Sequence, residues 1–100
     1  MVHRYSLQDQ AREFNRILTV GRPGRALIRG HADSGQRVAG NPVWTFDLEV
    51  TPEAGDPYRV QHQEIISTMA MGSYPDGSSM PCRIDPDDPH NIAFGDQPFM

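Results

Sequence analysis

The spacing of apolar residues along the chain follows a helical period near its start and a strand period afterwards. Between residues 6 and 18, apolar side chains recur at intervals of three and four positions, which is typical of one face of an amphipathic helix. Five residues form this face, called here the helix stripe: Leu7, Ala11, Phe14, Ile17 and Leu18. A helix of this length is marginal on its own, so the helix stripe has to pack either on the rest of the chain or on another chain.

From residue 25 onward the pattern favours five short strands. The clearest spans residues 43–51, where Trp44, Phe46, Leu48 and Val50 alternate with mostly polar neighbours. The other strands are expected at residues 26–31, 58–63, 80–85 and 91–94, with turns at 32–35, 52–57 and 85–89. Residues 36–42 are interpreted as a strand end or a loop, and residues 64–71 as either a short helix or a continued strand. Pro81 predicts that the fourth strand begins at a sheet edge.

This order of elements predicts a mainly β fold, with a small five-stranded barrel of OB-like or SH3-like type behind one N-terminal amphipathic helix. A flat sheet is disfavoured because its edges would be unprotected. We expect the helix over residues 1–20, the β-barrel domain over 21–95 and a loose tail over 96–100.

Length and composition narrow the class of protein. The chain has 100 residues, with 9 glycines and 9 prolines, which allows one hydrophobic core and favours turns and short strands. A multidomain enzyme and a coiled coil are excluded, and the single cysteine excludes a disulfide-built mini-protein. A core of this size leaves little room for a large cofactor, and we expect none. No apolar run has the length of a signal peptide or a membrane span, so we expect a cytoplasmic protein without membrane insertion.

Charge is distributed unevenly along the chain. Residues 1–40 carry seven arginines against three acidic residues, whereas residues 41–100 carry two arginines against ten acidic residues. Either the two halves attract each other within one fold, or the basic end contacts an acidic partner or nucleic acid.

Short motifs from Gly21 to Phe94 resemble those of a group of small uncharacterised bacterial proteins that are most common in actinobacteria. The matching segments are Gly-Arg-Pro-Gly-Arg-Ala at 21–26, Gly-Asn-Pro-Val at 40–43, Glu-Val-Thr-Pro at 49–52, Pro-Tyr-Arg-Val at 57–60 and Pro-Cys-Arg-Ile-Asp-Pro-Asp-Asp-Pro at 81–89. The resemblance implies a small β-barrel domain. It brings no known activity, because the motifs are signatures of turns and strands.

The densest group of potential metal ligands is Asp85, Asp87, Asp88 and His90. The spacing lacks the central glycine and distal glutamate of a calcium-binding loop, and aspartate before proline is typical of turns. No metal site is expected here. A small metal-dependent hydrolase built on His62, His90 and this turn is the least favoured function. His31 could converge with these two histidines in a barrel, with Glu64 or Asp47 orienting one of them, whereas Cys82 is interpreted as a buried, inert thiol.

A weak single-stranded nucleic-acid-binding barrel is the alternative function. It would use four arginines and an exposed aromatic residue, namely Arg22, Arg25, Arg29, Arg37 and Trp44. Two observations disfavour it. Trp44 shares a strand face with Phe46, which favours a place in the core, and the acidic second part of the chain would repel phosphates.

The favoured function is a non-catalytic protein-interaction or scaffolding module. In this hypothesis the chain is not an enzyme, and it either self-associates or docks on a larger protein through the helix stripe. A docked helix would need its partner surface from a second chain if the barrel were already closed and filled.

Overall fold

The structure is a computed structural model that describes residues 7–95, with side chains in the helix described from residue 11 onward. The helix was expected over residues 1–20 and a loose tail over 96–100. Residues 1–6 and the whole of this tail therefore lie outside the described residues. Within residues 7–95, one helix, one short 3-10 segment and five strands follow each other in the order α1 (Leu7–Val20), β1 (Arg22–Val38), β2 (Asn41–Pro52), β3 (Tyr58–Ile65), η1 (Ala70–Ser73), β4 (Ser79–Asp85) and β5 (Asp88–Phe94).

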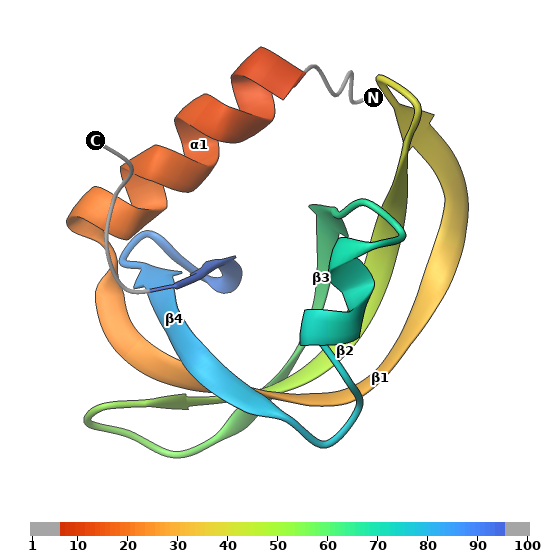
Figure 1. Cartoon of the computed structure of the whole chain (residues 1–100). Helices are drawn as coiled ribbons and strands as arrows, with labels where there is room; N and C mark the ends of the chain where they lie inside the picture. Colours follow the sequence, from red (N-terminus) through yellow and green to blue (C-terminus); the bar gives the residue numbers. More distant parts are fainter. Residues whose placement is uncertain (1–6, 96–100) are drawn as a thin grey trace.

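The five strands form one antiparallel sheet with the order β3-β2-β1-β4-β5. The sheet is strongly curved, and α1 lies across its open side (Figure 1). The predicted mainly β fold with an N-terminal helix is confirmed. The predicted closed barrel is not confirmed, because β3 and β5 form the two edges of the sheet and share no backbone ladder in the described residues.

The turn predicted at residues 32–35 is wrong, because β1 continues through this segment to Val38. The chain reverses instead at Ala39 and Gly40, whose φ values of 50° and 81° suit a two-residue hairpin turn. The turn-forming residues have a local effect only: the N–H of Gly35 donates to Oδ1 of Asp33 at 2.9 Å, and the pairing of β1 with β2 shifts register there. A side-chain turn of this kind interrupts the ladder without reversing the strand.

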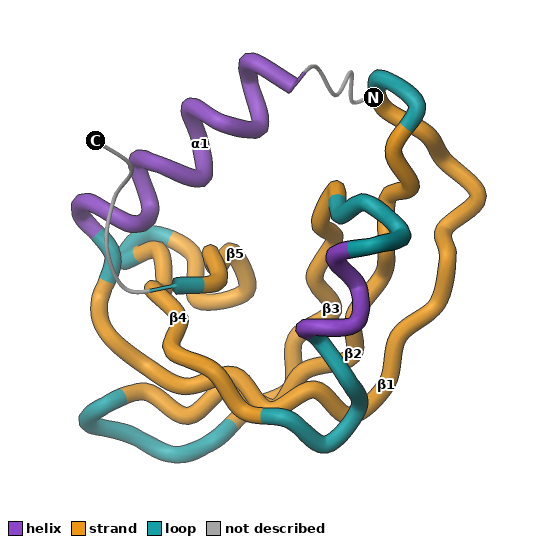
Figure 2. The backbone as a smooth tube through the Cα atoms, viewed as in Figure 1, coloured by secondary structure: helices purple, strands orange, loops and turns teal. Residues whose placement is uncertain are grey.

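The undecided segment 64–71 divides between a strand and a helical turn. β3 continues to Ile65, and the 3-10 segment η1 begins at Ala70 (Figure 2). Met71 and Tyr74, in and just after η1, pack against the buried core cluster. The loop between β3 and β4 therefore covers part of the concave face of the sheet.

The expected edge position of Pro81 is wrong, because β4 lies between β1 and β5. The carbonyl of Pro81 accepts the N–H of Gly95 at 2.8 Å, so its backbone polar side faces β5 at the point where that strand ends. In a strand, the N–H and the carbonyl of one residue point to the same side. The N–H that proline lacks would therefore face Gly95, beyond the end of β5, and its absence removes no hydrogen bond between β4 and β5.

The main core lies on the concave face of the sheet. Its buried members come from every strand and include Ala26, Ile28, Phe46, Leu48, Val50, Val60, Cys82, Ile84, Ile92 and Phe94. Cys82 is buried, as predicted from the sequence. This burial raises the pKa of its thiol to about 11. Neither α1 nor the short η1 segment, the helical parts of residues 7–95, could span a membrane as a helix.

Candidate functional site

The helix stripe is divided between two environments. Ile17 and Leu18 are buried against Ala93 of β5, with exposed fractions of 2% and 4%, and Phe14 is half-buried against the same cluster. Ala11, on the same face of α1, is exposed. The side chain of Leu7 lies outside the described residues. The second part of the helix stripe therefore packs on its own sheet, while its first part leaves Ala11 uncovered.

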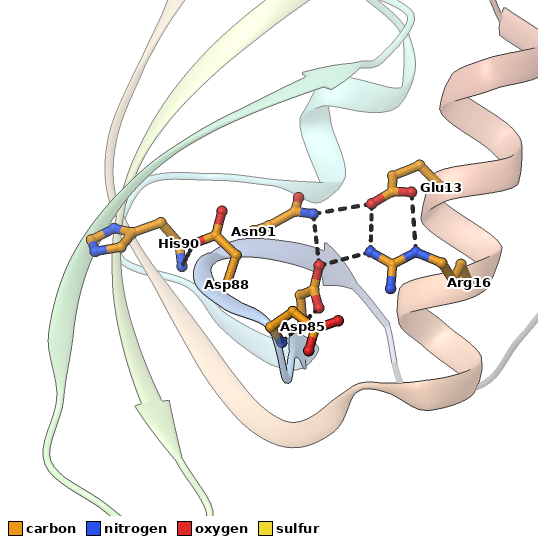
Figure 3. Close-up of polar contacts among 7 residues, drawn as sticks. Glu13, Arg16, Asp85, Asp88, His90 and Asn91 are labelled. Carbon is orange, nitrogen blue, oxygen red and sulfur yellow. Dashed lines mark hydrogen bonds and ion pairs between the residues drawn. The ribbon is translucent and has the colours of Figure 1, made fainter.

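A polar network, called here the helix clamp, fastens α1 beside this apolar contact (Figure 3). Arg16 donates to Oε1 of Glu13 and to Oδ2 of Asp85, both at 2.7 Å. Nδ2 of Asn91 donates to the same two oxygens, each at 3.1 Å. Oδ1 of Asp85 accepts the N–H of Asp87 at 2.9 Å. Both oxygens of this buried carboxylate are thus satisfied, which is the condition under which a buried charge is tolerated.

The helix clamp should make the docking of α1 sensitive to acid. The N–H of Asp87 and then Arg16 lower the pKa of Asp85, and Arg16 lowers the pKa of Glu13. A carboxylate whose pKa is lowered by folding stabilises the fold above its unfolded pKa of about 3.9 (Asp) or 4.3 (Glu), and this contribution is lost as the pH falls through the folded value. We therefore expect stability to fall below about pH 4.

Urea unfolding between pH 7 and pH 2 measures this dependence. The variant Asp85→Asn keeps an acceptor for the turn but loses the charge facing Arg16, so it should be less stable at pH 7 by about 1 to 3 kcal/mol and depend less on pH. Asp56→Asn, in the exposed loop after β2, is the matched control and should follow the wild-type curve. An Asp85→Asn curve parallel to the wild-type curve at all pH values would show that the clamp does not determine acid sensitivity.

Two of the aspartates considered as metal ligands accept hydrogen bonds from backbone N–H groups of their own turn. Asp85 accepts from Asp87 and from the helix clamp, and Oδ1 of Asp88 accepts the N–H of His90 at 3.0 Å. Within residues 7–95 as described, no group of three or more His, Cys, Asp or Glu side chains is arranged to hold a metal ion.

Two of the three histidines considered together do reach one region of the concave face. The strand register aligns His31, Phe46 and His62 across β1, β2 and β3. Nδ1 of His31 lies 2.7 Å from Oδ1 of Asp76, and Nε2 of His62 lies 2.8 Å from Oε1 of Glu64. Glu64 therefore orients His62, as considered from the sequence. Phe46 stands between the two pairs, so each histidine has its own carboxylate and they form no shared site.

His90 lies elsewhere, against the ring of Tyr58 at a centroid distance of 5.9 Å. His62 instead packs on Phe94, which comes from the other end of β5. The histidines and aspartates of the hydrolase hypothesis are thus distributed along the strands. Their contacts join neighbouring strands, strand ends and loops of the sheet to one another.

The residues of the nucleic-acid alternative are mostly engaged within the chain. The indole N–H of Trp44 donates to the carbonyl of Ile66 at 2.8 Å, and its ring packs against the core cluster. Arg29 is paired with Glu49 at 2.6 Å, and Arg37 with Asp33 at 3.0 Å. The remaining two, Arg22 and Arg25, are exposed near the start of β1.

A groove on the convex face of the sheet was not anticipated from the sequence. It has a volume of about 520 Å³ and is formed by the first part of β1, the end of β2 and the first residue of β4. Its lining, called here the convex groove, consists of Pro23, Gly24, Arg25, Leu27, Glu49, Thr51, Pro52, Glu53 and Ser79. Alternation along β2 indicates that Glu49 and Thr51 face away from the core. The register that brings them beside β1 and β4 is not evident from one sequence.

Comparison of the chain with protein-family models, with curated proteins and with solved structures gave no match. The resemblance to small actinobacterial proteins stays a prediction, and the function has to be argued from the geometry.

Proposed function

We propose that this chain is a non-catalytic interaction module that self-associates through the helix stripe at the exposed Ala11. The observation that carries the proposal is the division of the stripe. Ile17 and Leu18 are buried on the chain's own sheet, whereas Ala11 on the same face is exposed. An amphipathic helix that is fixed at one end presents an ordered apolar surface without the cost of folding it on binding.

The described polar groups support a binding role better than a catalytic one. The two histidine–carboxylate pairs are separated by Phe46, and the Cys82 thiol is buried with its pKa raised by burial. A nucleophile needs an adjacent base and an accessible position. A second copy is the first partner considered, because a two-fold interface needs only one self-complementary patch. A larger protein that docks on the same patch is the alternative.

We also propose that the sheet is of OB type rather than SH3 type. Two contacts between β3 and β5 support this arrangement. The hydroxyl of Tyr58 donates to the carbonyl of Pro89 at 2.6 Å, and further along the ring of His62 lies 5.0 Å from that of Phe94. The contacts advance in the same direction on both strands, so β3 and β5 run parallel along a seam that side chains bridge. A partly open five-stranded barrel is expected to have such a seam.

Sedimentation velocity over a range of protein concentrations tests the self-association. We expect the mass to rise above the 11.2 kDa of one chain as concentration increases. Ala11→Glu should shift the association to at least about tenfold higher concentration, because it places a charge in an apolar contact.

Gln36→Glu, which adds the same charge on the exposed β1–β2 hairpin, is the matched control and should associate like the wild type. A mass of one chain at all concentrations would contradict self-association. Equal association of the two variants would place the interface away from the helix stripe.

A further inference from the structure

The convex groove holds one arginine whose charge is not matched by a carboxylate. Arg25 donates from Nε to the hydroxyl of Ser79 at 3.1 Å, and within the described residues its two terminal amino groups have no hydrogen-bond partner. Four other arginines of the chain differ in this respect. Arg16, Arg29, Arg37 and Arg59 each have a carboxylate oxygen within 3.0 Å.

The hydrogen bond to Ser79 also orients the guanidinium of Arg25. With Nε directed toward β4, the terminal amino groups remain available for a ligand, and such a pair of parallel N–H donors matches the two oxygens of a carboxylate. The strand register places Thr51 directly opposite Arg25, which adds a hydroxyl group on the β2 side of the groove.

The rest of the convex groove is suited to an apolar side chain. Leu27 is half-buried at one end, opposite Glu49 and Ser79 in the strand register, and Pro23 and Pro52 lie at the other end. The prolines have no N–H to offer, and Leu27 lies on the central strand of the sheet, whose backbone is engaged on both sides by β2 and β4. Recognition in this groove therefore depends on side chains, with Arg25 supplying the charge and Leu27 the apolar contact.

Two carboxylates restrict which anion this groove accepts. Glu49 is paired with Arg29 at 2.6 Å, and Glu53 is exposed and has no cationic partner in the described part of the chain. A phosphate with nearly two negative charges would be repelled by Glu53. A single carboxylate on Arg25 carries half that charge, and an adjoining apolar side chain would fill the volume beside it.

We propose that the convex groove binds an extended segment of a partner protein that carries a single carboxylate, with this carboxylate on the terminal amino groups of Arg25 and a neighbouring apolar side chain on Leu27. This site is separate from the helix stripe and does not depend on self-association. It gives Arg25, in the basic first part of β1, a carboxylate partner.

Titration of the ¹⁵N-labelled full chain with the peptide acetyl-Pro-Leu-Asp-Leu-amide, followed by NMR, tests the proposal. We expect saturable shifts that centre on Leu27, Thr51 and Ser79. The peptide with Asn in place of Asp, and the variant Arg25→Gln, should each weaken binding by about tenfold or more, because both remove the charge-assisted pair. Arg25→Lys keeps the charge without the paired donors and should be intermediate between wild type and Arg25→Gln.

Arg59→Gln is the matched control, since Arg59 is exposed on the neighbouring β3, outside the groove, and already has Asp47 as its partner. It should bind the Asp peptide within about twofold of the wild type.

Shifts that never saturate, equal binding of the Asn peptide, or unchanged binding by Arg25→Gln would each overturn the proposal. Inorganic phosphate that binds as tightly as the peptide would show a general anion site instead. The same spectra report whether each variant is folded. Binding of the peptide by Ala11→Glu as tightly as by the wild type would show that this site is independent of the helix stripe.

Discussion

Phe46→Ala should lower the free energy of unfolding by about 3 to 5 kcal/mol, the largest effect expected of any single change in this chain. Phe46 is completely buried at the centre of the concave face. Its ring lies 5.4 Å from that of Phe94 and 6.2 Å from that of Tyr74. Alanine would leave a cavity where β2, β5 and the loop after β3 meet, and a domain of marginal stability loses a large part of its total by such a change.

Urea and thermal unfolding of Phe46→Ala and Phe46→Leu measure this effect. The leucine variant keeps most of the buried volume and should lose only about 1 to 1.5 kcal/mol, so it stays folded if the alanine variant does not. Val20→Ala, at a side chain that is 52% exposed, should change stability by less than about 0.5 kcal/mol. A Phe46→Ala variant as stable as Val20→Ala would contradict the packing described for the concave face.

Gly21→Ala should destabilise the fold by about 1 to 3 kcal/mol, because there is no space for a side chain where α1 joins β1. A Cβ atom at this position would lie 2.4 Å from the carbonyl oxygen of Ile17 and 2.9 Å from Cβ of Arg83. The Ile17 carbonyl cannot move away easily, since it accepts the N–H of Gly21 at 2.8 Å. Relief of the clash would shift the end of α1 and with it the buried pair of the helix stripe.

Gly30→Ala provides the matched control, because a Cβ atom at Gly30 would meet nothing within 4 Å and its φ is outside the left-handed region. Chemical denaturation should give a change of less than about 0.5 kcal/mol for this variant. In addition, the NMR shifts of Ala93 should change in Gly21→Ala and not in Gly30→Ala, since Ala93 packs against Ile17 and Leu18. Equal stability of the two variants would show that the junction adapts to a side chain without cost.

Regular hydrophobic periods in the sequence predict α1 and β2 well, because one face of each element is buried and its spacing repeats. The path of β1 could not be predicted in this way. The segment from Asp33 to Gly35 carries strong turn-forming residues, yet its side-chain hydrogen bond is accommodated inside a strand, and the reversal is made by Ala39 and Gly40. The position of Pro81 was predicted wrongly for a related reason. A strand can contain proline either at the edge of a sheet or beside the end of a neighbouring strand, and the sequence does not distinguish these two positions.

The sites depend even more on register than the strands do. Nothing in the order of residues places His31 and His62 on either side of Phe46, or Arg25 opposite Thr51, because these neighbours come from different strands. The helix clamp likewise joins Glu13 to Asn91 across most of the chain. In contrast, the helix stripe was evident from the sequence, and only its division between a buried and an exposed part required the structure.

Hydrogen exchange along α1, compared between a low and a high protein concentration, tests whether the chain self-associates through the helix stripe. We expect strong protection of the amides near Ile17 and Leu18 at both concentrations, since these residues are buried on the chain's own sheet. The amides around Ala11 should exchange quickly in dilute protein and become protected as the concentration rises. Exchange around Ala11 that is the same at both concentrations, with a mass that stays at 11.2 kDa, would contradict the role of the helix stripe in self-association.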